Sequence, residues 1–206
     1  MNASFRIRRA RPADADAIHA VARASWHAAY GDLLDADAID ATIDEWYGVA
    51  DLRESIDADR HAMAVAERTE TVDGDSTTEA TGGSTGATNN DAPGLVGFAH
   101  ATDNADAGRA ELRRLYVREP FWDDGVGTAL LTHVARPMRA AGHDAISAVV
   151  LADNEIGLGF YRARGFAVVD EQTSTFGGET VAEVIVEAPL EQILDEESDL
   201  PHGTSQ

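Results

Sequence analysis

Residues 115–131 decide the fold of this chain, and they read LYVREPFWDDGVGTALL. An apolar strand end is followed by a short turn, and a glycine-opened loop then runs into a helix. Glycine lets backbone N–H groups approach a ligand closely, and the first turn of a helix offers unpaired N–H donors with a partial positive charge. The stretch therefore predicts an anion cradle suited to a phosphate or pyrophosphate. The alternative is an ordinary tight turn.

A second motif, NEIGLGFYRARGF, occupies residues 154–166. Asn154 is a good helix N-cap, and Ile156, Phe160 and Ala163 fall on one helical face. Gly165 suits the position just past a helix end, before the chain turns into a strand. The pattern predicts a helix over 155–164 between strands at 145–151 and 166–175.

Taken together, the two motifs resemble those of the GNAT superfamily, the GNAT-type N-acetyltransferases. The resemblance extends from Phe5 to about Leu190 and is sharpest over residues 111–166. In the family the first motif usually begins with Gln or Arg, in the pattern Gln/Arg-x-x-Gly-x-Gly, whereas Trp122 stands at that position here. Because backbone amides do most of the pyrophosphate binding in such loops, we expect one weaker side-chain contact and an intact site.

The resemblance implies an α/β fold with a mixed, mostly antiparallel central sheet of about six to seven strands, flanked by helices. The sheet would be splayed between the strands at 109–117 and 145–151. In the first of these strands Leu112 and Leu115 have opposite parity, which puts them on opposite faces of a regular strand. A β-bulge near Arg113 and Arg114 returns them to one face. The alternative is a strand buried on both faces.

We expect a single acetyltransferase domain over residues 1–190. Residues 69–94 contain almost no large apolar side chain, so they bury too little surface to offset the entropy of ordering. They are interpreted as a disordered acidic loop between strands at 61–68 and 95–102, the alternative being a domain boundary. Residues 191–206 are interpreted as a frayed acidic tail.

The composition excludes several classes of protein. The net charge is −21, and all 16 basic residues are Arg. This excess of acid without Lys resembles proteins adapted to a molar-salt cytoplasm; the alternative is a merely acidic protein from a GC-rich genome. The acidity argues against nucleic-acid binding, which needs clustered cations. The absence of Cys excludes thiol nucleophiles and disulfides, and the absence of Lys excludes a Walker A loop.

No apolar run approaches the roughly 20 residues of a membrane span, and no signal peptide opens the chain. We therefore expect a soluble cytoplasmic protein with no membrane partner, and the assembly is left open between a monomer and a homodimer. The seven His form no His-x-x-x-His pair, so we expect no metal.

The family resemblance implies transfer of an acetyl group from acetyl-CoA to a primary amine by direct attack in a ternary complex. The coenzyme pyrophosphate would be held by backbone N–H groups of Asp123, Asp124, Gly125, Val126, Gly127 and Thr128. Leu115, Tyr116 and Val117 would pair with amides of the coenzyme as an added strand does. An N–H near Val117 would face the carbonyl oxygen, where negative charge builds during attack.

The side-chain roles also come from the resemblance. Asn154 resembles the residue that binds the pantetheine arm, or it is a plain helix cap. Tyr161 resembles the proton donor to the departing thiolate, or it is a core tyrosine. Glu111 stands where many relatives carry the general base, or it is an exposed strand carboxylate.

Residues 25–34, SWHAAYGDLL, resemble the acceptor side of some family members. Trp26 and Tyr30 lie four residues apart on a helix and would line the amine pocket, or they simply pack that helix. The acceptor is left open between a small-molecule amine and a protein N-terminus. A rival function is a non-catalytic acyl-CoA-binding sensor or regulatory module, which would share Gly125 and Gly127 but would not need Glu111 and Tyr161.

Overall fold

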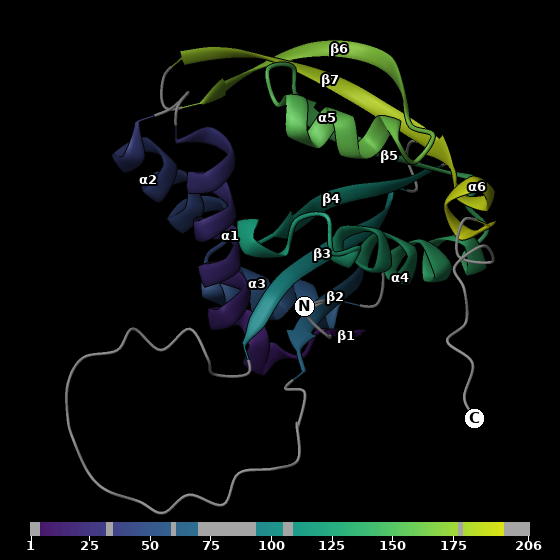
Figure 1. The fold of residues 1–206 in the computed structure, drawn as a ribbon, viewed down its shortest axis with the longest axis horizontal. Coiled ribbons are helices and arrows are strands. Elements are labelled where there is room, and N and C mark those ends of the chain that lie inside the picture. Colours follow the sequence, from purple (N-terminus) through teal and green to yellow (C-terminus); the bar gives the residue numbers. More distant parts are fainter. Residues whose placement is uncertain are drawn as a thin grey trace, which may run out of the picture.

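The computed structural model describes residues 5–31, 35–58, 61–69, 94–104, 109–176 and 179–195. Within these ranges the strands form one seven-stranded sheet in the order β1-β2-β3-β4-β5-β7-β6 (Figure 1). Neighbouring strands are antiparallel except β4 and β5, which run parallel. The predicted mixed, mostly antiparallel sheet is confirmed. The strands are β1 (Phe5–Arg9), β2 (His61–Arg68), β3 (Leu95–Asn104), β4 (Arg109–Val117), β5 (Ala145–Leu151), β6 (Ala167–Phe176) and β7 (Glu179–Pro189).

Helices cover both faces of the sheet. In Figure 1, α1, α2 and α3 gather at the left of the view, and α4 and α6 lie at the right. The α-helices are α1 (Ala15–Tyr30), α2 (Ala36–Trp46), α3 (Val49–Asp57), α4 (Val126–Ala140), α5 (Glu155–Arg162) and α6 (Leu190–Asp195). Two short 3₁₀ helices, η1 (Pro12–Asp14) and η2 (Glu119–Phe121), precede α1 and the loop before α4. Among the described residues no helix is both long and apolar enough to cross a membrane.

Each face of the sheet has its own apolar core. On one face, Ile18 of α1 and Ile39 of α2 pack with Phe98 of β3, and all three are fully buried. On the other face, Leu130 and Leu131 of α4 belong to a core that also includes residues of β5, α5 and α6. The helical spacing of apolar residues explains this arrangement, because it gives each helix a single stripe to bury.

The bulge predicted in β4 is confirmed. His100 pairs with Arg114 and Ala101 pairs with Leu112, so Arg113 is the extra residue. The extra residue restores the parity of the strand, and Leu112 and Leu115 both contact the core beneath α4.

The predicted splay is also present. The parallel pairing of β4 with β5 covers only three residue pairs and ends at Leu112 and Ala148. Beyond that point β4 bends away from β5 (Figure 1), and the described strands leave this part of its edge unpaired.

The C-terminal boundary needs a correction. We expected a frayed tail from residue 191, but α6 continues to Asp195 and buries Leu190 and Ile193. Leu190 and Ile193 are three residues apart, so they lie on one side of α6, and both belong to the core that includes α4. The rest of the predicted tail and residues 70–93 of the predicted loop lie outside the described residues.

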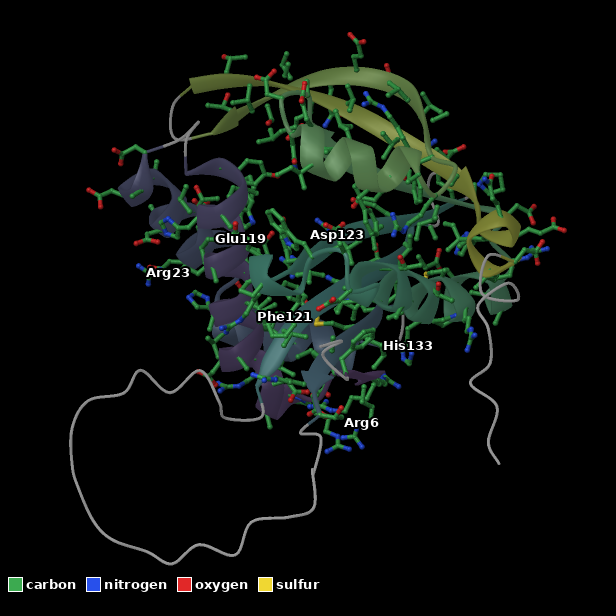
Figure 2. The ribbon with its side chains drawn as sticks, in the orientation of Figure 1. Arg6, Arg23, Glu119, Phe121, Asp123 and His133 are labelled. Atoms are coloured by element: carbon green, nitrogen blue, oxygen red, sulfur yellow. The ribbon has the colours of Figure 1, made fainter. Side chains whose placement is uncertain are left out.

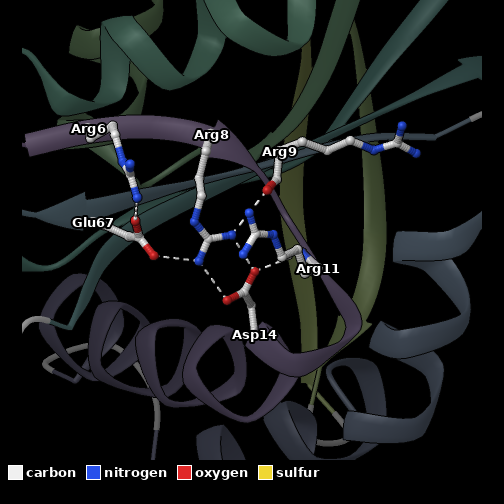
Figure 3. Close-up of polar contacts among 6 residues, drawn as sticks. All are labelled: Arg6, Arg8, Arg9, Arg11, Asp14 and Glu67. Carbon is white, nitrogen blue, oxygen red and sulfur yellow. Dashed lines mark hydrogen bonds and ion pairs between the residues drawn. The ribbon is translucent and has the colours of Figure 1, made fainter.

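A cluster of ion pairs joins β1 to β2 and to η1 (Figure 3). Arg8 contacts both carboxylate oxygens of Asp14, at 2.7 and 2.8 Å, and also contacts Glu67 at 2.5 Å. Arg6 contacts the other oxygen of Glu67 at 2.7 Å. Hydrogen bonds from Arg8 hold the pKa of Asp14 below its usual range, and those from Arg8 and Arg6 lower the pKa of Glu67 to about 2.

Candidate active site

One cavity of about 780 Å³ follows the splay between β4 and β5. Its walls come from the end of α1, from β4 beyond the bulge, from the loop that enters α4, from the end of β5 and from α5. Of the residues expected to hold the coenzyme, all but Asp124 line it. These are Leu115, Tyr116, Val117, Asp123, Gly125, Val126, Gly127, Thr128 and Asn154.

The loop before α4 adopts the shape that its glycines predict. Asp123 and Gly125 have positive φ angles of 63° and 80°, and Gly125 is the N-cap of α4. Asp123 and Asp124 are exposed, and Figure 2 shows Asp123 on the loop that enters α4. Their carboxylates therefore reach solvent while the first turn of α4 presents its N–H groups.

Gly127 has a second role that the motif did not reveal. A Cβ atom at this position would lie 2.8 Å from the ring of Phe160 on α5. The absent side chain therefore leaves room for the ring of Phe160 against the first turn of α4, beside the cavity. By contrast, a Cβ atom on Gly125 would meet nothing within 4 Å, and the positive φ angle is its constraint.

Trp122, at the position where relatives carry Gln or Arg, is turned toward the protein. Its indole Nε1 donates a hydrogen bond to the carbonyl oxygen of Val117, at 2.8 Å. The indole has no second donor. It therefore ties the loop to the end of β4 and has no N–H left for a ligand.

Arg164 places a positive charge beside the cradle. Its guanidinium lies 3.7 Å from the ring centroid of Phe160, its Nε donates to Thr128 Oγ1 at 3.0 Å, and its Nη1 donates to the carbonyl oxygen of Phe160 at 2.8 Å. These contacts fix a cation in the cavity wall next to the first turn of α4. Sequence reasoning missed this residue, although it stands within the second motif.

Asn154 joins two elements across the cavity. Its Oδ1 accepts a hydrogen bond from the backbone N–H of Gly157 at 2.8 Å, which caps α5. Its Nδ2 donates to the hydroxyl of Tyr30 at 2.9 Å, which connects α5 to α1. The capping alternative is thus confirmed, and the amide still lines the cavity. Its contact with pantetheine stays a prediction.

Tyr161 lies in the wall opposite β4. Its ring packs edge-on against Phe160 and Phe166, with centroids 5.4 and 5.0 Å away. Burial raises the pKa of its hydroxyl above the ordinary value, so the phenol keeps its proton at neutral pH. No hydrogen bond to another described residue engages that hydroxyl, and the residue lines the cavity. A proton donor in this position is consistent with the predicted role.

Comparison with known proteins decides the family. The family model described as "Acetyltransferase (GNAT) family" matches residues 42–166, more than half of the chain. The chain belongs to the GNAT acetyltransferase family. It is accordingly an acetyl-CoA-dependent acyltransferase of that family. No curated protein matches the chain significantly.

Solved structures share the GNAT fold. The PaiA N-acetyltransferase from Thermoplasma acidophilum, solved in complex with coenzyme A, is 24% identical with a TM-score of 0.67, over 90% of this chain and 99% of that one. A GCN5-related N-acetyltransferase from Rhodopseudomonas palustris is 18% identical with a TM-score of 0.61, over 92% and 96%. The ribosomal-protein-S18-alanine N-acetyltransferase from Escherichia coli is 13% identical with a TM-score of 0.59, over 91% and 94%.

The acceptor side of this GNAT domain differs from the sequence-based expectation. Tyr30 lines the cavity, but Trp26 does not. Trp26 is 5% exposed and packs behind the wall, 5.0 Å from the ring of Tyr30 and 6.4 Å from that of Tyr116. Its burial favours the packing alternative. Sequence reasoning missed Ser25, Arg113 and Arg114, which line the same end of the cavity.

Glu111 is not brought to the cavity wall. It is half-buried on β4, paired with Thr102 of β3 and Ser147 of β5, on the part of the strand before the bulge. The geometry therefore gives no support to a direct contact with the amine, and its role as a base stays a prediction.

Proposed function

We propose that this GNAT protein moves an acetyl group from acetyl-CoA to a primary amine by direct attack within a ternary complex. One observation carries the proposal: a single cavity extends from the N–H groups at the start of α4, past the unpaired edge of β4, to the side chains of α1. Coenzyme and acceptor can meet in such a cavity without a covalent intermediate. The chain also has no cysteine to carry one.

The coenzyme would enter along α4 and α5. The N–H groups of residues 123–128 would bind its pyrophosphate, and Arg164 would add a charge-assisted hydrogen bond to a phosphate oxygen. The unpaired edge at Leu115–Val117 would take the pantetheine amides as an added strand. The Thermoplasma relative solved with coenzyme A supports a coenzyme in this fold.

The chemical step needs a neutral amine and a protonated leaving group. The amine nitrogen attacks the thioester carbonyl, the C–S bond breaks, and the hydroxyl of Tyr161 gives its proton to the departing thiolate. Because Glu111 lies outside the cavity wall, we assign the removal of the amine proton to water. The nearby cations Arg113 and Arg114 favour the neutral amine over the ammonium form.

The acidic composition of the chain favours activity in concentrated salt. With 37 acidic residues, 16 Arg and no Lys, the chain repels itself at low ionic strength, and salt screens that repulsion. We therefore propose a halophilic cytoplasmic enzyme, and its assays belong in molar KCl.

The test is amine-dependent release of the CoA thiol. Purified protein in 2 M KCl receives acetyl-CoA together with a panel of amines that includes amino acids, polyamines and peptides. Release of CoA in step with formation of an acetylated amine supports the proposal. Tight binding of acetyl-CoA with no release for any amine contradicts it and favours the sensor module.

A further inference from the structure

The acceptor end of the cavity is rich in hydrogen-bond donors that have no acceptor. The hydroxyl of Ser25 is buried and has no hydrogen-bond partner among the described residues. The oxygen of Tyr30 accepts from Asn154 Nδ2, and the hydroxyls of Tyr47 and Tyr116 share one hydrogen bond of 2.8 Å. Tyr30 therefore keeps its own proton for another partner, and Ser25, Tyr30 and Tyr116 all line the cavity.

These hydroxyls are donors at neutral pH. Burial raises the pKa of Tyr30 to about 12, and burial with the neighbouring tyrosines raises the pKa of Tyr116 well above its ordinary value. Neither phenol ionises near pH 7, so each presents an O–H group. A buried donor without an acceptor is unfavourable, so the ligand of this wall should supply acceptor oxygens.

Two arginines add positive charge at the same end. Arg113 is the exposed bulge residue, and it makes no hydrogen bond or ion pair with the part of the chain that the structure describes. Arg114 is held in place: its guanidinium lies 4.6 Å from the ring centroid of Tyr47, and it donates to the carbonyl oxygen of Trp46 at 2.7 Å. Both line the cavity.

The charge of the cavity wall is opposite to that of the whole chain. The chain has 37 acidic residues against 16 arginines, yet among the described residues the wall contains Arg113, Arg114 and Arg164 against Asp123 and Glu155. Asp123 belongs to the coenzyme loop and Glu155 to the exposed first turn of α5. Glu183, whose charge is felt by Tyr30, lies outside the wall and is held by Gln172 Nε2 at 2.8 Å.

Building on the proposed function, we propose that the acceptor amine also carries a carboxylate, as a free amino acid does. The carboxylate would bind Arg113 and the hydroxyls of Ser25, Tyr30 and Tyr116, because an ionised carboxylate accepts several charge-assisted hydrogen bonds at once. The same wall disfavours polyamines, because their ammonium groups are positively charged like the arginines and offer hydrogen-bond donors without an acceptor oxygen. A peptide N-terminus, whose nearest carbonyl is an uncharged amide, would be a weaker acceptor.

The test compares each amino acid with its own amide, which differs only at the carboxylate. Acetyl-CoA turnover is measured for the twenty amino acids, their amides and spermidine at one fixed KCl concentration. We expect the preferred amino acid to exceed its amide by at least tenfold in kcat/KM and to exceed spermidine by more. Equal or better turnover of the amide or of spermidine overturns this inference while the acetyl transfer itself stands. Turnover of no amine at all contradicts the proposed function and this inference with it.

Substitutions test whether Arg113 is responsible for the preference for an amino acid over its amide. Arg113→Gln should reduce the ratio of amino acid to amide by about tenfold or more, through KM of the acceptor, with the affinity for CoA unchanged. Arg113→Lys, which keeps the charge, should recover part of that ratio. Arg162→Gln is the matched control, since Arg162 is exposed and outside the cavity wall. If Arg113→Gln leaves the ratio as it is in the wild type and in the control, the carboxylate does not bind at this wall.

Discussion

The two ends of the cavity are built in different ways. The proposed coenzyme end consists mainly of backbone: N–H groups at the start of α4, with Gly125 at a positive φ angle and Gly127 against the ring of Phe160. The acceptor end consists of side chains brought together from α1 and β4, including Ser25, Tyr30 and Arg113. In the proposed account, the backbone binds the common coenzyme and the side chains select the acceptor. The predictions below test that division, from the largest expected effect to the smallest.

Gly127→Val should abolish detectable binding of CoA. The new side chain would begin 2.8 Å from the ring of Phe160, so the ring or the first turn of α4 must shift, and we expect the N–H groups to lose their position. Calorimetric titration with CoA measures the affinity, and thermal unfolding measures the accompanying loss of stability. Adding Phe160→Leu should restore part of the melting temperature by making room. An unchanged affinity in Gly127→Val would show that the coenzyme does not bind at the start of α4.

Tyr161→Phe should lower kcat strongly and leave the affinity for CoA nearly unchanged. Loss of a positioned proton donor costs up to about 10²–10⁴-fold, and a thiolate is already a fair leaving group, so the lower part of that range is expected. The ring still packs against Phe160 and Phe166, which preserves the fold. Steady-state kinetics together with CoA titration separate the two quantities. An unchanged kcat in this variant would show that Tyr161 only packs against its neighbours and does not donate a proton.

Arg164→Gln should weaken CoA binding by roughly tenfold or more, the value of one charge-assisted hydrogen bond. The substrate acetyl-pantetheine, which lacks the phosphates of CoA, should show no such loss. Arg162→Gln, at the last residue of α5 and outside the cavity wall, serves as the control. An equal loss with acetyl-pantetheine would mean that Arg164 acts only through its contacts with Thr128 and Phe160.

Arg8→Gln, outside the cavity wall, should lower the melting temperature at neutral pH, flatten its response to acid and leave kcat unchanged. Glu67 and Asp14 have folded pKa values below their ordinary ones. Their contribution to stability is therefore present above about pH 4.5 and is lost as the pH falls toward 2. We expect the melting temperature of the wild type to fall more than that of Arg8→Gln over this interval, with kcat equal at pH 7. If the melting temperatures of the two proteins change in parallel with pH, the lowered pKa values do not depend on Arg8.

The same division explains how far the sequence could be interpreted. Helix and strand positions follow from the spacing of apolar residues, and the bulge at Arg113 follows from the parity of Leu112 and Leu115. The shape of the loop that enters α4 was predictable because it depends on local geometry, which the glycines and the start of the helix indicate.

The acceptor end was not predictable in the same way. Whether Trp26 or Ser25 faces the cavity depends on how α1 rotates against β4, which no local pattern specifies. Arg162 and Arg164 look alike in the sequence, but Arg162 ends α5 whereas Arg164 lies in the turn after it and meets Thr128. Glu111 was placed by analogy, and pairing with both β3 and β5 keeps it before the splay.

Direct transfer in one cavity is the central claim, and a single-turnover experiment tests it most directly. Protein in excess is mixed with acetyl-CoA labelled in the acetyl group, and the amine is added afterwards. We predict that the protein carries no covalent label before the amine is added, and that the label then enters the amine at the same rate as CoA is released. Labelled protein that accumulates first and then delivers its acetyl group to the amine would contradict the account.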